Sequence, residues 1–129
     1  MIVNLEISPA TLSELFSSAI EGGDPVTTAS RGGWCDGIYW RRRKHRGDYW
    51  YSEPETFAGA ILIDVIEVDD EQTGHKMKHR LDERRIATGL KAMAERFPGR
   101  FAQIFDGNID APCADAFLQA CVFGEEKYA

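Results

Sequence analysis

Apolar and polar positions alternate in two different ways along the middle of the chain, and each pattern predicts a strand. The run Ala60 to Val68 (A-I-L-I-D-V-I-E-V) is largely apolar at both alternate sets of positions and rich in β-branched residues, which is typical of a strand inside a sheet. The run His75 to Leu81 alternates with the basic residues Lys76, Lys78 and Arg80, which is typical of a strand half in water. We expect the two strands to form an antiparallel hairpin around the loop 69–74.

Apolar residues at helical spacing predict three helices. The first runs from about Pro9 to Glu21, with Ser8 as its cap. The second follows the capping residue Asp82 and ends near Phe97. The third starts near Asp110 to Pro112 and runs to Phe123, where Gly124 provides a left-handed stop.

Two short aromatic runs, Trp34 to Trp40 and Tyr49 to Ser52, flank the most basic segment of the chain, Arg41 to Arg46. The simplest interpretation is a hairpin whose tip carries the positive charge. Pro54 to Ala58 is expected to form one helical turn, and Phe101 to Phe105 a connector that tucks onto the core. Near the N-terminus, Ile2 to Ile7 alternates and predicts either a short edge strand or a packed arm.

The order of these elements predicts an α+β fold, with a small antiparallel sheet of about four strands and about three helices packed on one face. The 129 residues are enough for a single compact domain, 1–129, with one core. An edge strand of so small a sheet could support a homodimer.

The sequence features that bear on the cellular compartment point to the cytoplasm. No run approaches the roughly 20 apolar residues of a membrane span, and the N-terminus has no signal-peptide pattern. The three cysteines, Cys35, Cys113 and Cys121, are odd in number and lack the spacing of a disulfide framework. We therefore expect reduced thiols that fill the core, and no membrane partner.

The charge of the chain is polarised. The whole sequence carries −6, and the five cations between Arg41 and Arg46 leave −11 for the remainder. Arginines beside aromatic rings can form a protein-binding hot spot, or can hold phosphates while the rings stack on bases. A solvated loop above core aromatics is the third interpretation. The candidate partner-binding residues are Tyr39, Trp40, Arg41, Arg42, Arg43, Lys44, Arg46, Tyr49, Trp50 and Tyr51.

The histidines and glycines do not predict a cofactor site. His75 and His79 lie four residues apart on a predicted strand, about 13 Å along its axis, which is too far to chelate one zinc ion. Gly22-Gly23 and Gly32-Gly33 do not stand between a strand and a helix in a phosphate-binding pattern. We expect neither a metal nor a cofactor.

Acidic residues gather in two places. Paired carboxylates can perform acid–base chemistry or bind magnesium, and an acidic surface can imitate DNA. Turn chemistry and solvation explain the first cluster more simply because it falls in a hairpin loop. The clusters are Glu67, Asp69, Asp70 and Glu71, and Asp106, Asp110 and Asp115.

Three motifs resemble a family of short proteins found in phages and prophages. They are A-I-E-G-G (Ala19 to Gly23), W-C-D (Trp34 to Asp36) and A-D-A-F-L-Q-A-C-V-F-G-E (Ala114 to Glu125), the last followed by Tyr128. The chain departs from the family in the inserted segment Asp24 to Gly33, in its basic segment, and in ending Tyr-Ala where the family usually has Tyr-Gly. The resemblance implies a phage context and no known activity, so it assigns no functional residues.

Because no nucleophile, metal cage or cofactor loop is evident, we expect a non-enzymatic protein. Given the resemblance, the leading hypothesis is a phage accessory protein that binds and inhibits a host macromolecular complex, such as a CRISPR–Cas defence system. The alternative is a nucleic-acid-binding accessory protein that uses the same basic-aromatic segment. A small-molecule-binding or nucleotide-binding protein, or a small enzyme, is the third hypothesis and requires a concave pocket.

Overall fold

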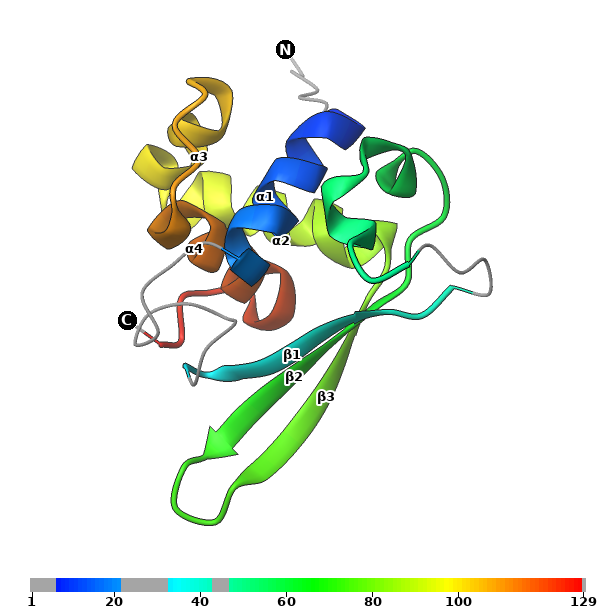
Figure 1. The fold of residues 1–129 in the computed structure, drawn as a ribbon. Helices are drawn as coiled ribbons and strands as arrows, with labels where there is room; N and C mark the ends of the chain where they lie inside the picture. Colours follow the sequence, from blue (N-terminus) through cyan, green and yellow to red (C-terminus); the bar gives the residue numbers. More distant parts are fainter. Residues whose placement is uncertain (1–6, 22–32, 43–46, 129) are drawn as a thin grey trace.

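The computed structural model describes residues 7–21, 33–42 and 47–128, and over these ranges the fold is α+β (Figure 1). The described residues form four α helices, two short 3-10 helices and one three-stranded antiparallel sheet. In chain order the elements are α1 (Pro9–Glu21), β1 (Cys35–Trp40), η1 (Trp50–Ser52), η2 (Pro54–Phe57), β2 (Ile63–Asp70), β3 (His75–Leu81), α2 (Glu83–Arg96), α3 (Pro98–Phe105) and α4 (Ala111–Phe123). The predicted edge strand Ile2 to Ile7 lies, except for Ile7, outside the described residues.

The predicted helix ends are confirmed by their capping contacts. Ser8 accepts a hydrogen bond from the backbone N–H three residues later at 3.1 Å, and Asp82 and Asp110 do the same at 2.9 Å. Gly124 ends α4 with φ of 74°, the left-handed conformation that favours glycine. The segment expected to be a connector is instead part of the helix α3, which starts at Pro98.

The sheet has the strand order β1-β2-β3, so β2 is central, as its apolar pattern predicts. Ile63 of β2 pairs with Trp40 on one side and Leu81 on the other. The prediction of a fourth strand was wrong. The segment Tyr49 to Ser52 does not pair with Trp34 to Trp40. Its residues 50–52 form η1 instead, and Trp34 to Trp40 pairs with β2 through β1. The turn predicted over Pro54 to Ala58 is confirmed as η2.

The core lies between the sheet and the helices. Phe16 of α1, Phe117 of α4 and Val65 of β2 are fully buried. Every residue of α4 from Cys113 to Val122 is buried, which places this helix in the middle of the helical layer. At Gly89, where α2 crosses α4, an added Cβ would lie 2.6 Å from the backbone of α4, so only glycine permits this approach.

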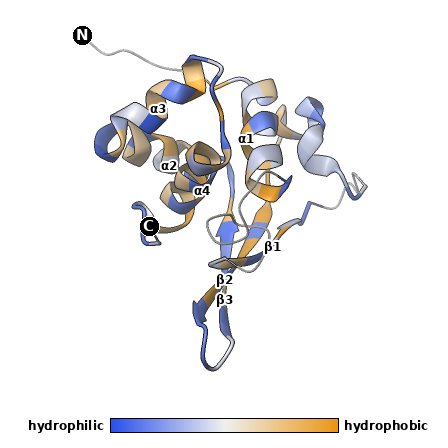
Figure 2. Cartoon of the chain, turned by 60° about the vertical axis from the view of Figure 1, so that its left-hand side comes forward, coloured by the Kyte–Doolittle hydropathy of each residue, from blue (hydrophilic) through white to orange (hydrophobic). Residues whose placement is uncertain are grey.

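The β2–β3 hairpin projects away from the helices and ends in a hydrophilic tip (Figures 1 and 2). Apolar residues instead concentrate on the helices and on the part of the sheet beside them (Figure 2). In the part of the chain that the structure describes, no helix is both long and apolar enough to span a bilayer.

Candidate functional site

Those predicted partner-binding residues that the structure describes come from two segments of the chain, and two of them, Trp50 and Tyr51, are buried. Tyr39 and Trp40 end β1, and Arg41 and Arg42 follow it. Tyr49, Trp50 and Tyr51 come from the turn before η1 and from η1 itself. Arg43, Lys44 and Arg46 lie outside the described residues.

Trp50 and Tyr51 are core residues, so their expected role as exposed contacts was wrong. Trp50 is 6 % exposed, and its ring packs against Phe16 and Phe57, with centroids 6.2 Å away in both cases. Tyr51 is 7 % exposed and donates a hydrogen bond from its hydroxyl to Glu21 at 2.8 Å. Burial and this carboxylate raise the pKa of Tyr51 to about 12. Both residues join η1 to α1, because exposing them instead would leave two large rings in water.

Tyr39, Arg41, Arg42 and Tyr49 are exposed, and Trp40 is half-buried against Trp50. Tyr39 lies over Gly37, where a Cβ would be only 2.4 Å from the tyrosine oxygen. The guanidinium of Arg41 sits 5.0 Å above the Tyr39 ring, a cation–π contact. An exposed arginine-aromatic pair is therefore present at the end of β1.

The outward face of the sheet adds further cations to this pair. The register aligns Tyr39 of β1, Asp64 of β2 and Arg80 of β3 across the sheet. The Asp64 side chain is 1 % exposed, and its two oxygens accept hydrogen bonds from Arg41 Nε at 2.9 Å and Arg80 Nε at 3.1 Å. Burial favours protonation of Asp64, but the hydrogen bonds from Arg80 and Arg41 outweigh it and lower its pKa.

We call this surface the outward basic face. It carries four cations and two carboxylates, a surplus of two positive charges on a chain whose net charge is −6. Lys76 pairs with Asp36 at 2.9 Å, and Lys78 is exposed beside them. From the sequence, these lysines were assigned only to a half-solvated strand. Their alternation along the strand was the signal that they share one face. The face consists of Asp36, Tyr39, Arg41, Asp64, Ile66, Lys76, Lys78 and Arg80.

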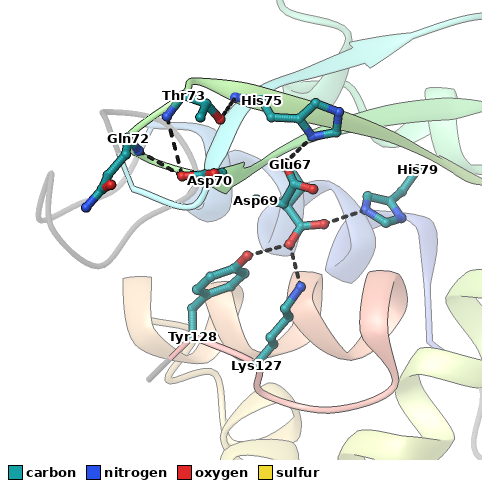
Figure 3. A network of polar contacts seen from close by, with 9 residues as sticks. All are labelled: Glu67, Asp69, Asp70, Gln72, Thr73, His75, His79, Lys127 and Tyr128. Atoms are coloured by element: carbon teal, nitrogen blue, oxygen red, sulfur yellow. Dashed lines mark hydrogen bonds and ion pairs between the residues drawn. The ribbon is translucent and has the colours of Figure 1, made fainter.

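The inward face holds a second cluster, centred on Glu67 (Figure 3). The Glu67 side chain is 1 % exposed; His79 Nε2 lies 2.9 Å from its Oε1, and Lys127 Nζ lies 2.8 Å from its Oε2. Tyr128 donates its hydroxyl proton to the same Oε2. Burial of the carboxylate favours protonation, but hydrogen bonds from Lys127, Tyr128 and His79 outweigh it and lower the pKa of Glu67 to about 2.

A neighbouring polar network holds the backbone of the same tail. Gln119 exchanges two hydrogen bonds with the backbone of Tyr128, at 2.7 and 2.8 Å. Asp115 accepts hydrogen bonds from Gln119 at 2.7 Å and from the indole of Trp34 at 2.9 Å. Burial raises the pKa of Asp115, and these two contacts only partly oppose it. The ring of Trp34 also stacks on that of Tyr128, with centroids 5.9 Å apart.

We call the residues around Glu67 and Asp115 the tail clasp: Trp34, Glu67, His79, Asp115, Gln119, Lys127 and Tyr128. Sequence reasoning did not join these residues. Its placement of Glu67 in a solvated hairpin loop was wrong, because Glu67 is buried at an inward position of β2, in line with Ile63 and Val65. Both oxygens of Glu67 are engaged, Oε1 by His79 and Oε2 by Lys127 and Tyr128. These contacts hold the tail against the inward face of the sheet.

The other residues that the sequence offered as candidate sites do not come together in the described part of the structure. His75 contacts Asp69 at 2.7 Å, whereas His79 contacts Glu67, so the two histidines serve different partners. Asp70 accepts backbone N–H groups of the hairpin turn, as turn chemistry predicts (Figure 3). Within residues 7–21, 33–42 and 47–128, no three acidic, histidine or cysteine side chains gather as a metal site.

All three cysteines are free and buried, as expected for thiols that fill the core. Burial raises the pKa of Cys35 to about 12 and that of Cys113 to about 11, and it raises the pKa of Cys121 as well. A thiol with so high a pKa carries almost no thiolate at neutral pH, which argues against a role as a nucleophile.

Comparison of the chain with protein-family models, with curated proteins and with solved structures found no match. The candidate site therefore rests on the geometry of the chain's own residues, and among those that the structure describes the outward basic face combines an exposed aromatic ring with exposed charged groups.

Proposed function

We propose that this chain is a non-enzymatic phage accessory protein that docks on a host macromolecular complex and inhibits it, with a CRISPR–Cas-type defence complex as the target class. The docking surface is the outward basic face. The observation that carries the docking proposal is the cross-strand register, which joins the arginine-aromatic pair of β1 to the basic stripe of β3. The phage context comes from the sequence resemblance, and the inhibitory role is the hypothesis that this context suggests.

The contacts on this face favour a protein partner. Arg41, Arg80 and Lys76 are each paired with a carboxylate of the chain, so their positions are fixed before a partner arrives. Fixed side chains lose less conformational entropy on binding. Tyr39 is 43 % exposed beside Arg41, and tyrosine and arginine are the residue types that dominate protein-binding hot spots. The partner surface is expected to be acidic.

The test is affinity capture of the tagged chain from nuclease-treated lysate of an infected bacterial host, followed by mass spectrometry. One stoichiometric host complex is expected with the unaltered chain. Tyr39→Ala combined with Lys78→Glu should remove it, whereas Arg84→Glu, an exposed charge reversal on α2, should retain it. Recovery that is equal for both variants would show that the outward basic face is not the docking surface.

Inhibition is tested separately. Cells that carry the captured defence complex should lose their resistance to a targeted phage when they express the unaltered chain, and should keep it when they express the Tyr39→Ala, Lys78→Glu variant. Resistance that is unchanged by the unaltered chain would refute the inhibitory role while leaving the docking result intact.

Nucleic-acid binding is the second candidate function, and the exposed Tyr39 ring beneath Arg41 is the observation that favours it, because a base can stack where a guanidinium lies nearby. Binding to DNA or RNA would weaken steeply with salt. Replacing Arg41, Arg42, Arg43 and Lys44 together with alanine would abolish it. Fluorescence anisotropy with labelled single strands at about 50 and 200 mM salt measures both effects. A signal independent of salt would exclude this candidate.

A further inference from the structure

An apolar groove among the helices is lined by residues of α1, η2, α2 and α3. Its volume is about 460 Å³, within the range of roughly 300 to 1,000 Å³ that is typical of small-molecule sites. The walls are formed by Leu12, Phe57, Ile61, Ile86 and Phe101, and most of these side chains are otherwise buried. The groove therefore reaches from the surface to the edge of the core.

Small residues keep the groove open. Gly59 is part of its lining, and Ala87 and Ala94 line it from α2. The two alanines are seven residues apart, so they lie on the same face of the helix. Ala87 is exposed, which means that a larger side chain at this position could enter the groove without displacing core residues.

The charged residues of the lining stand at opposite ends. Glu83 and Lys91 are eight residues apart on α2, about 12 Å along the axis at a rise of roughly 1.5 Å per residue. Glu83 accepts the backbone N–H of Ile61, so its carboxylate is held in place. Lys91 is exposed and, among the described residues, has no ion-pair partner. An apolar ligand with one anionic end would place that end at Lys91, because Glu83 repels it from the other.

We propose that this groove binds a small amphipathic molecule that consists of an apolar chain and an anionic head group, a medium-chain carboxylate. The chain lies along α2 against Ile86 and Leu90, and the head group pairs with Lys91. This inference is independent of the proposed docking function because the two sites share no residue.

The test uses isothermal titration calorimetry with decanoate, below its micelle concentration, and the full chain. Saturable one-to-one binding is expected. Lys91→Gln should weaken it about tenfold, as expected for the loss of one charge-assisted contact. Ala87→Trp should abolish it by filling the groove. Lys78→Gln, which removes an equally exposed lysine from the outward basic face, should leave it unchanged. Circular dichroism checks that each variant is folded.

Three outcomes would overturn the proposal. The first is the absence of saturable binding, and the second is binding that persists in Ala87→Trp or is equally strong for neutral decanol. The third comes from a chain in which Val3 and Leu5 are replaced by serine. If decanoate binds only to this doubly substituted variant, the occupant of the groove is the chain's own first residues, which precede the groove residue Ile7.

Discussion

Two buried carboxylates on β2, Asp64 and Glu67, show how differently the two faces of the sheet treat the same kind of group. They are three residues apart and point to opposite faces, and each side chain is 1 % exposed. Asp64 is held by Arg41, which directly follows β1, and by Arg80 of β3, and both arginine side chains are about half exposed. Glu67 is held by His79 and by a tail 60 residues further along the chain.

The difference concerns what each ion pair can do. The arginines around Asp64 reach solvent, so they can also reach a partner. The groups around Glu67 close the inward face, and their positions fix the C-terminal tail on the sheet. A buried carboxylate therefore organises exposed arginines on one face and a structural contact on the other.

The largest expected effect is the loss of the inward carboxylate. Glu67→Ala should lower the free energy of unfolding by about 3 to 4 kcal/mol at pH 7, because it leaves Tyr128 and His79 without their acceptor and opens a cavity. Chemical denaturation measures the change. Glu71→Ala, in the exposed hairpin turn, is the matched control and should show no measurable loss. A similar loss in both variants would remove the distinction between the faces.

The pH dependence of stability sharpens the same contrast. The pKa of Glu67 falls from its ordinary 4.5 to about 2 in the folded state. A lowered pKa stabilises the fold above pH 4.5, and this contribution, about 3 kcal/mol at 1.36 kcal/mol per unit, is lost as the pH falls from 4.5 to 2. Denaturation midpoints of the unaltered chain should drop over this window more steeply than those of Glu67→Gln. If the midpoints of the two chains fell in parallel with pH, the lowered pKa of Glu67 would be contradicted.

A smaller loss is expected for the outward carboxylate. Asp64→Ala should lower the free energy of unfolding by about 1 to 2 kcal/mol, because both arginines can turn to water once it is gone. The same substitution frees both arginines and should weaken binding to an acidic partner, although it also removes a negative charge from the outward basic face. Unchanged binding by a folded Asp64→Ala variant would show that the arginines need not be held in place for recognition.

The smallest effect is expected at the exposed pair of Lys76 and Asp36. Both side chains are about half exposed at a distance of 2.9 Å, so solvent screens the interaction. Lys76→Ala should leave the denaturation midpoint unchanged at physiological salt and should weaken only partner binding. A clear shift of the midpoint would show that this pair supports the sheet.

Patterns local in the sequence predicted much of the fold. The bounds of α1 and β3, the caps of α2 and α4 and the central position of β2 follow from apolar spacing and capping residues within a few positions of each other. These features depend on backbone geometry and on nearby side chains, which the sequence shows directly.

Other features depended on partners far away along the chain. The run at residues 49–52 is rich in aromatic residues that favour strands, yet Trp50 packs against Phe16 and Phe57 and does not pair with β1. The candidate site was predicted only in part for the same reason. Tyr39 and Arg41 were identified, whereas the cations of β3 joined them only through the strand register.

The sequence by itself determined where most of the helices and strands form and the polarised charge of the chain, because these follow from local periodicity and composition. Only the tertiary structure decided which strand pairs with β1, which aromatic rings are buried, and that Glu67 meets Tyr128. Those outcomes come from competition among distant groups for the same buried space and the same hydrogen-bond acceptors, and short-range patterns do not record that competition.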